Sequence, residues 1–128
     1  MRKFGTHSVY SINYHIVFCP KRRKAILCGD IVTDLTSIIY TVSRELGVVV
    51  EQVSIQPDHV HIFVVSTPRI TPHTIVKRIK GTSSNILRKK YRQLLKLPAL
   101  WSSSYYCGTI GHVSEDIVKK YIENQKGK

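Results

Sequence analysis

Hydrophobic and polar residues alternate along residues 9–19 of the chain. An alternation with a period of two places successive side chains on opposite faces of a β-strand. One face would be apolar and would carry Tyr10, Ile12, Tyr14, Ile16 and Phe18. The other face would carry Ser11, Asn13, His15 and Val17. The pattern predicts a strand that ends at a basic loop over residues 20–24.

The hydrophobic period then changes from two to that of a helix. Apolar residues recur at helical spacing at Ile31, Leu35, Ile38, Ile39, Val42 and Leu46. Asp30 is a good N-cap residue and Gly47 a good helix stop, so a helix is expected between them. A second helix should begin with Thr71 as its cap and Pro72 at its first position. Its inner face is expected to hold Ile75, Ile79, Ile86 and Leu87.

Three further strands and a last helix complete the order of elements. Strands are expected over residues 48–55, 59–65 and 105–110, with a turn at Pro57-Asp58, a connector over residues 97–103 and a stop at Gly111. The last helix would run from Ser114 to Gln125. The order predicts one α+β domain over residues 1–128, with a ferredoxin-like (split βαβ) antiparallel sheet. Two helices would cover one face of the sheet, and the other face would remain open for a site.

The charge balance indicates a polyanionic partner. Twenty Lys and Arg face eight Asp and Glu, which gives a net charge of +12. A field of one sign this large favours nucleic acid, although a generally soluble basic surface is the simpler alternative. Candidate phosphate contacts are Lys21, Arg22, Arg23, Arg88, Lys89, Lys90 and Arg92.

Other sequence features indicate a cytoplasmic protein with no membrane partner. No apolar run approaches the roughly 20 residues that span a bilayer, and the N-terminus does not resemble a signal peptide. The three cysteines show no Cys-x-x-Cys spacing, which argues against a disulfide framework or a thiolate zinc site. We expect these thiols to be buried and inert.

A His-x-His pair opens the strand expected over residues 59–65. Side chains at positions i and i+2 of a strand point the same way, about 7 Å apart along the chain. His59 and His61 could therefore converge on one metal ion, with a third ligand from elsewhere. The alternative is two ordinary histidines on an open sheet face, stacked on bases.

The last helix carries a candidate nucleophile. Ile117, Val118, Tyr121, Ile122 and Gln125 form one stripe. Tyr121 and Gln125 are four residues apart and hence neighbours on the helix surface. Tyr121 could simply pack, but beside a metal site its hydroxyl could attack a DNA phosphate and form a covalent intermediate. The amide oxygen of Gln125 could be the third ligand; these residue types leave the identity of the metal open.

Together these segments resemble the single-tyrosine HUH transposases, the TnpA-type enzymes of the smallest prokaryotic insertion sequences. The resemblance rests on residues 14–23, 57–61 (Pro-Asp-His-Val-His), 101–111 and 118–125 (Val-Lys-Lys-Tyr-Ile-Glu-Asn-Gln). It implies that His59, His61 and Gln125 bind Mg²⁺ or Mn²⁺ and that Tyr121 forms a 5′-phosphotyrosine bond.

The resemblance also implies a substrate and an assembly. The substrate would be single-stranded DNA with hairpins at the ends of the element, excised as a circle and reinserted. The protein would be a homodimer in which the final helix of one subunit can complete the site of the other. Two alternatives remain: a related HUH nickase of the replication or relaxase type, and a non-catalytic module that binds single-stranded nucleic acid.

Overall fold

The computed structural model describes residues 11–109 and 115–128 and has the expected α+β architecture. Its sheet has four antiparallel strands in the order β2-β3-β1-β4. The strands are β1 (Ile12–Phe18), β2 (Val49–Gln56), β3 (His59–Ser66) and β4 (Tyr106–Thr109). The helices are α1 (Asp30–Leu46), α2 (Pro72–Lys90) and α3 (Glu115–Asn124), with short 3₁₀ turns η1 (Lys21–Arg23) and η2 (Arg92–Lys96). The predicted stop at Gly111 and helix start at Ser114 lie outside the described residues.

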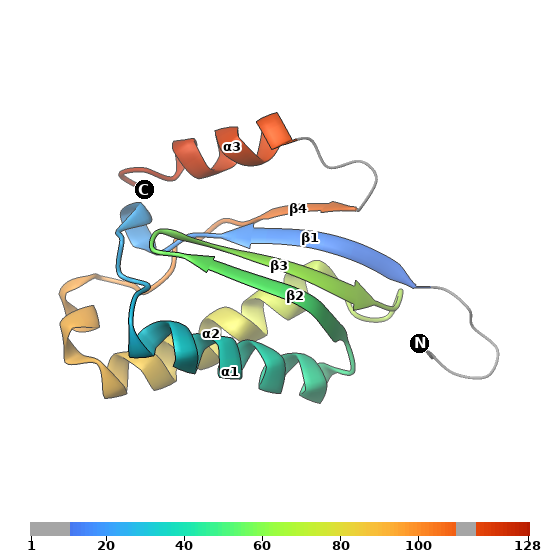
Figure 1. The fold of residues 1–128 in the computed structure, drawn as a ribbon, viewed down its shortest axis with the longest axis horizontal. Coiled ribbons are helices and arrows are strands. Elements are labelled where there is room, and N and C mark those ends of the chain that lie inside the picture. Colours follow the sequence, from blue (N-terminus) through green and yellow to red (C-terminus); the bar gives the residue numbers. More distant parts are fainter. Residues whose placement is uncertain (1–10, 110–114) are drawn as a thin grey trace.

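The three helices lie on both faces of the sheet. Helices α1 and α2 cover one face, and α3 crosses the opposite face (Figure 1). The alternation predicted for β1 places Ile16 and Phe18 in the core beneath α1 and α2. His15 and Val17 point to the other face and are buried as well. The sheet face that was expected to stay open is therefore partly covered by α3.

The helix signals were right in most respects. The Thr71 side chain caps α2 by accepting a hydrogen bond from the Thr74 backbone N–H at 3.2 Å. Gly47 ends α1 in the left-handed conformation, with φ of 82°. The prediction that Asp30 is the cap of α1 was wrong, because Gly29 occupies that position at φ of 58° and Asp30 lies in the first turn. Positive φ favours glycine, since it has no Cβ to clash with the backbone.

Two predictions about burial were also wrong, and the stripe predicted on the last helix is only partly buried. Ile86 is 44% exposed, because the inner face of α2 follows Ile75, Ile79, Ser83 and Leu87 at a spacing of four. Ile117 is 53% exposed on α3, while Val118 is buried. Of the cysteines, Cys19 is buried, but Cys28 is exposed in the loop before α1. Among the described residues, no helix combines the length and the apolar character needed to cross a membrane.

Candidate active site

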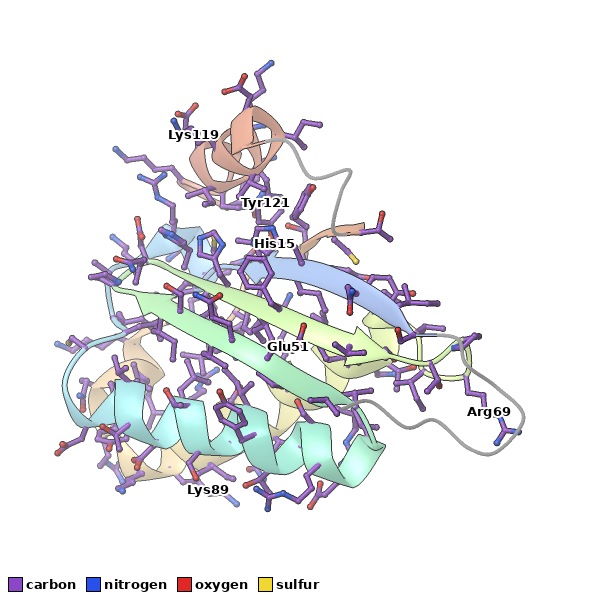
Figure 2. The ribbon with its side chains drawn as sticks, turned by 45° about the vertical axis from the view of Figure 1, so that its right-hand side comes forward. His15, Glu51, Arg69, Lys89, Lys119 and Tyr121 are labelled. Carbon is purple, nitrogen blue, oxygen red and sulfur yellow. The ribbon has the colours of Figure 1, made fainter. Side chains whose placement is uncertain are left out.

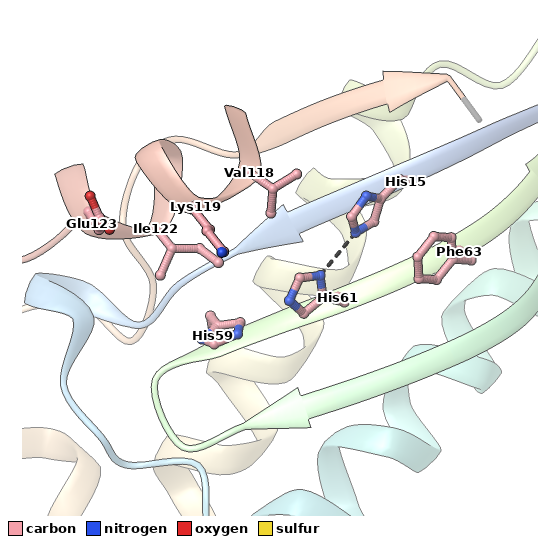
Figure 3. A pocket seen from close by; sticks show the side chains of 8 residues that line it. All are labelled: His15, His59, His61, Phe63, Val118, Lys119, Ile122 and Glu123. Carbon is pink, nitrogen blue, oxygen red and sulfur yellow. Dashed lines mark hydrogen bonds between the residues drawn. The ribbon is translucent and has the colours of Figure 1, made fainter. Parts of the chain in front are cut away.

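The two histidines of β3 lie under α3. His59 and His61 point to the same side of the sheet, with ring centroids 4.9 Å apart and ring planes at 76°. They line a pocket of about 620 Å³ between the sheet and α3 (Figure 3). The rest of its lining consists of His15, Phe63, Val118, Lys119, Ile122 and Glu123. The strand geometry expected for His-x-His thus places both imidazoles at the floor of one pocket.

The orientation of the His59 ring is set by the turn before β3. Its Nδ1 atom lies 2.7 Å from Oδ1 of Asp58. A carboxylate only accepts hydrogen bonds, so Nδ1 of His59 carries the proton. The other oxygen of Asp58 is ion-paired with Nε of Arg23 at 3.2 Å. With Nδ1 engaged in this way, Nε2 of His59 keeps its lone pair for a ligand.

The His61 ring has an imidazole as its partner. Its Nδ1 atom lies 2.9 Å from Nε2 of His15, which is 6% exposed on β1. The rings of His15 and Phe63 are stacked, with centroids 4.3 Å apart and an angle of 7°. Sequence reasoning assigned no role to His15, because a contact across 46 residues depends on strand register. The one available signal was that His15 faces away from the apolar side of its strand.

Burial keeps the His61 imidazole neutral. Desolvation, with smaller contributions from the neighbouring His59 and His15 rings, lowers the pKa of His61 from 6.5 to about 4. A metal ion binds the neutral form of imidazole. The electrostatics of this pocket therefore favour the protonation state that a metal ligand needs.

Tyr121 lies between α3 and the sheet (Figure 2). Its hydroxyl is 3.1 Å from Oγ of Ser104, and its ring centroid is 6.4 Å from that of Tyr106. Desolvation raises the pKa of Tyr121 from 10.0 to about 12, although the hydrogen bond with Ser104 lowers it. In this position the phenol stays protonated at neutral pH.

Gln125 follows directly after α3 and is 5% exposed. Its Oε1 atom accepts hydrogen bonds from Oγ of Ser102 at 2.8 Å and from Oγ of Ser104 at 3.0 Å. Tyr121 and Gln125 were expected to be neighbours because they are four residues apart on the helix. In the structure both side chains contact the same hydroxyl, that of Ser104. Sequence reasoning treated these serines only as part of a connector and a family motif.

The half-buried Lys80 of α2 holds the segment of Ser102 and Ser104 in place. The Lys80 ammonium donates to the backbone carbonyls of Ser102 at 2.7 Å and Ser104 at 2.8 Å. Desolvation lowers the pKa of Lys80 from 10.5 to about 8. The serines that engage Tyr121 and Gln125 are therefore anchored to α2.

His59 and His61 have the arrangement of part of a metal site. Both histidines have an engaged Nδ1 and a free Nε2 on one pocket, which suits a divalent ion with nitrogen ligands. Neither Tyr121 nor Gln125 belongs to the lining of that pocket. Within residues 11–109 and 115–128, no group of three or more His, Cys, Asp and Glu is arranged to hold a metal ion. Two imidazoles do not complete such a site, so further ligands would have to come from other groups.

The candidate phosphate contacts fall into two groups on opposite sides of the sheet. Lys21, Arg22 and Arg23 form η1 beside the end of α3, where Nη1 of Arg23 donates to the Ile122 carbonyl at 3.3 Å. The second group lies at the end of α2 and in η2, and Lys89 marks its position far from Tyr121 (Figure 2). In this group Lys90 is ion-paired with Asp34 at 2.9 Å, and Arg88 donates to the Leu97 carbonyl at 3.0 Å. Arg88, Lys89 and Arg92 line a shallow hollow with Ser84, Asn85 and Leu95.

Known proteins resemble this chain over nearly its whole length. The family model described as "Transposase IS200 like" matches residues 8–125. The ISDra2 transposase TnpA of Deinococcus radiodurans is 32% identical over 98% of this chain and 92% of its own length. The transposase for insertion sequence element IS200 of Salmonella typhimurium is 25% identical over 94% of this chain and 83% of its own length.

Solved structures share the fold. A crystal structure of a candidate transposase from Deinococcus radiodurans has a TM-score of 0.89 at 27% identity and covers 99% of this chain and 100% of its own. A REP-associated tyrosine transposase bound to a REP hairpin has a TM-score of 0.56 at 13% identity, with 96% of this chain and 69% of its own covered. At that identity the second likeness concerns the fold.

Proposed function

Because the chain belongs to the IS200-like transposase family, whose members cut and rejoin DNA, we propose that it transfers single strands of DNA at the ends of an insertion sequence through Tyr121. The observation that carries the proposal is the paired arrangement of His59 and His61. Each ring has its Nδ1 engaged by a neighbour and its Nε2 free on a pocket beneath the helix that bears Tyr121 and Gln125. Such a pocket can hold a metal ion and a phosphate side by side.

The proposed reaction has two transesterification steps. In the first, the Tyr121 oxygen attacks a DNA phosphorus and the bond from phosphorus to the 3′-oxygen breaks. The phenol loses its proton, and the departing 3′-oxygen gains one. The 5′-phosphate is then linked to Tyr121. In the second step, the 3′-hydroxyl of another DNA end attacks the same phosphorus and releases the phenol. A covalent intermediate conserves the phosphodiester bond energy between the steps.

His59, His61 and Gln125 would hold Mg²⁺ or Mn²⁺, which would neutralise charge on the phosphate oxygens and orient the bond to be broken. Tyr121 needs that help, since burial raises its pKa to about 12 in the position described above. Asp58 and Arg23 would keep the His59 ring in place during the reaction.

We further propose that the chain forms a homodimer and that α3 of the second copy completes each site. On its own chain, α3 presents Val118 and Ile122 to the histidine pocket, while Tyr121 and Gln125 are bonded to the serine segment. A helix that follows a complete ferredoxin-like unit is free to dock on a neighbouring copy. Exchange of identical elements between protomers is a low-cost route to such a dimer.

The proposed substrate is single-stranded DNA with hairpins at the ends of the element. The related fold of the REP-associated tyrosine transposase is seen bound to a REP hairpin. In this chain, Lys21 and Arg22 of η1, beside the end of α3, would contact the strand to be cut. Arg88, Lys89, Lys90 and Arg92, on the other side of the sheet, would contact phosphates of the folded DNA, which position the substrate without reading its sequence.

The test is the formation of a covalent adduct. Purified protein, labelled single-stranded DNA from the ends of the element, and MgCl₂ or MnCl₂ should give a labelled protein band on a denaturing gel. The band should disappear in EDTA and in Tyr121→Phe. Tyr40→Phe is the matched control, because Tyr40 is exposed on α1 and should leave the band unchanged.

The same assay separates the alternatives. DNA binding without any adduct, with Tyr121→Phe indistinguishable from the unmodified protein, would indicate a non-catalytic binding module. Adduct formation without strand joining would indicate a nickase of the replication or relaxase type.

A further inference from the structure

The buried imidazole of His15 on β1 has no assigned role in the proposed reaction. His15 is 6% exposed, and its Nε2 lies 2.9 Å from Nδ1 of His61. We propose that His15 is a positioning residue that holds the His61 ring in the tautomer and orientation needed to present Nε2 to a divalent metal ion. The inference rests on the proposed function, because it concerns the same pair of histidines.

The strand register creates this contact. In the antiparallel pair of β1 and β3, His15 lies opposite Phe63, and Val17 lies opposite His61. His15 and His61 are therefore diagonal neighbours on one face, a relation that lets long or aromatic side chains meet. On the other side of β1, His15 lies opposite Gly108 of β4. Glycine leaves no side chain at the position beside the imidazole.

Packing restricts rotation of the His15 ring. The ring is stacked on Phe63, with centroids 4.3 Å apart, and meets the edge of Tyr106 at 5.9 Å and 71°. Its plane is also nearly parallel to that of His61, at 15° and 5.2 Å. Because these contacts hold the His15 ring in place, its Nε2 atom can hold the orientation of the His61 ring that donates to it.

The direction of the hydrogen bond decides which nitrogen of His61 is free. If Nδ1 of His61 donates to Nε2 of His15, the lone pair of His61 remains on its Nε2. In the opposite direction, Nε2 of His61 would carry a proton and could not bind a metal. The carboxylate of Asp58 imposes the first arrangement on His59. We infer the same arrangement for His61, so that both Nε2 lone pairs are available together.

His15 does not serve as a third metal ligand in this arrangement. Its Nε2 is occupied by His61, and the part of the chain that is described contains no cluster of three metal-ligating His, Cys, Asp or Glu side chains. Metal-bound histidines commonly donate their second N–H to a carboxylate, a carbonyl or water, and loss of that partner typically costs ten- to a hundredfold in metal affinity or activity. His15 would fill this role with an imidazole, in place of the commoner oxygen acceptor.

The first experiment measures binding of MnCl₂ to the full chain without DNA, from the electron paramagnetic resonance signal of free Mn²⁺. His15→Phe keeps the stacked ring but removes the acceptor, and it should weaken Mn²⁺ binding at least about tenfold. His15→Gln restores an acceptor and should recover most of the affinity. His73→Phe makes the same chemical change at an exposed site on α2 and should bind Mn²⁺ like the unmodified protein.

The controls separate failure of this inference from failure of the proposed function. If His61→Ala abolishes Mn²⁺ binding while His15→Phe leaves it unchanged, the role of His15 is refuted and the metal site stands. If His59→Ala and His61→Ala both bind Mn²⁺ normally, the metal site is refuted and the role of His15 with it. Equal losses in His15→Phe and His15→Gln would also refute it, because the acceptor would then not matter.

A second experiment needs no substitution in the site. Long-range ¹H–¹⁵N spectra of the histidine rings of the unmodified protein, in EDTA, report which nitrogen of each neutral ring is protonated. His61 should show a protonated Nδ1 and a bare Nε2, and His15 a bare Nε2. A His61 ring protonated at Nε2 would overturn the inference even if no His15 variant folds.

Discussion

His61 lies where protonation is opposed from several directions. Its ring is partly desolvated, and the two neighbouring imidazoles are groups that would repel a second positive charge. The pKa of the buried His15 ring is lowered as well, by desolvation. At the scale of single residues, the pocket therefore keeps the imidazoles of His15 and His61 neutral, with their lone pairs available. The same burial lowers the stability of the folded chain in acid.

The pH dependence of folding should reveal this effect. The pKa of His61 is about 4 in the folded chain and 6.5 without burial, so the unfolded chain binds more protons between those values. Stability should therefore fall as the pH decreases from 6.5 towards 4. Thermal unfolding in EDTA at a series of pH values should show this fall, and His61→Gln should show a shallower one.

If the stability of His61→Gln fell with decreasing pH as steeply as that of the unmodified chain, the lowered pKa of His61 would be contradicted. His73→Gln is the matched control, because it makes the same chemical change at an exposed position on α2.

At the scale of elements, polar contacts join α3 to the rest of its own chain, among them the hydrogen bond from Arg23 to the Ile122 carbonyl. Ser104 engages both Tyr121 and Gln125, and Ser102 engages Gln125 alone. At the far end, backbone hydrogen bonds join Arg22 to Lys128 and to Gly127. The helix thus has a defined docked position, which it would have to leave in the proposed exchange between copies.

Ser104→Ala should loosen this docking. Loss of a hydrogen bond of this kind costs about 1 kcal/mol, which corresponds to an opening equilibrium about fivefold larger. Hydrogen exchange of the α3 amides should accelerate by that factor, while the amides of β1 and β3 should exchange as before.

Ser103→Ala is the matched control for this prediction, because Ser103 is exposed between the two bonded serines. Unchanged exchange in Ser104→Ala would show that apolar contacts, such as those of Val118, dominate the docking of α3.

At the scale of the whole molecule, the candidate active site and one of the two basic groups lie on opposite sides of the sheet. The histidine pocket lies between the sheet and α3, and α2, at whose end the second basic group lies, covers the opposite face of the sheet (Figure 1). A DNA molecule that touches both groups must pass around an edge of the sheet or bridge two copies of the chain. The proposed dimer would carry two copies of each surface.

Mixing two inactive variants tests the proposed exchange of α3. Tyr121→Phe keeps its histidines and His59→Ala keeps its tyrosine, so a mixed dimer has one intact site only if α3 acts on the partner. Random pairing of equal amounts in a symmetric dimer should restore about a quarter of the unmodified adduct yield.

Native mass spectrometry of the same sample would confirm that mixed dimers form. If they form and no adduct appears, each site is built within one chain. A particle mass near the 14.6 kDa monomer would contradict the dimer itself.

Local pattern in the sequence was sufficient for the order of elements, the cap at Thr71, the stop at Gly47 and the shared face of His59 and His61. Each of these depends on residues within a few positions of one another, through strand and helix periodicity or backbone preference. The tyrosine and glutamine pair was visible for the same reason, since residues four apart are neighbours on any helix.

Only the tertiary structure decided which distant residues contact the side chains of the candidate site. The bond between His15 and His61 depends on the register of β1 against β3, and the capture of Gln125 by Ser102 and Ser104 depends on where α3 docks. The exposure of Ile86 was misjudged, and Ile117 of the predicted stripe is exposed, because a helical stripe is wider than the surface that covers it. Contacts between distant segments are set by packing of the whole chain, and local periodicity carries no information about them.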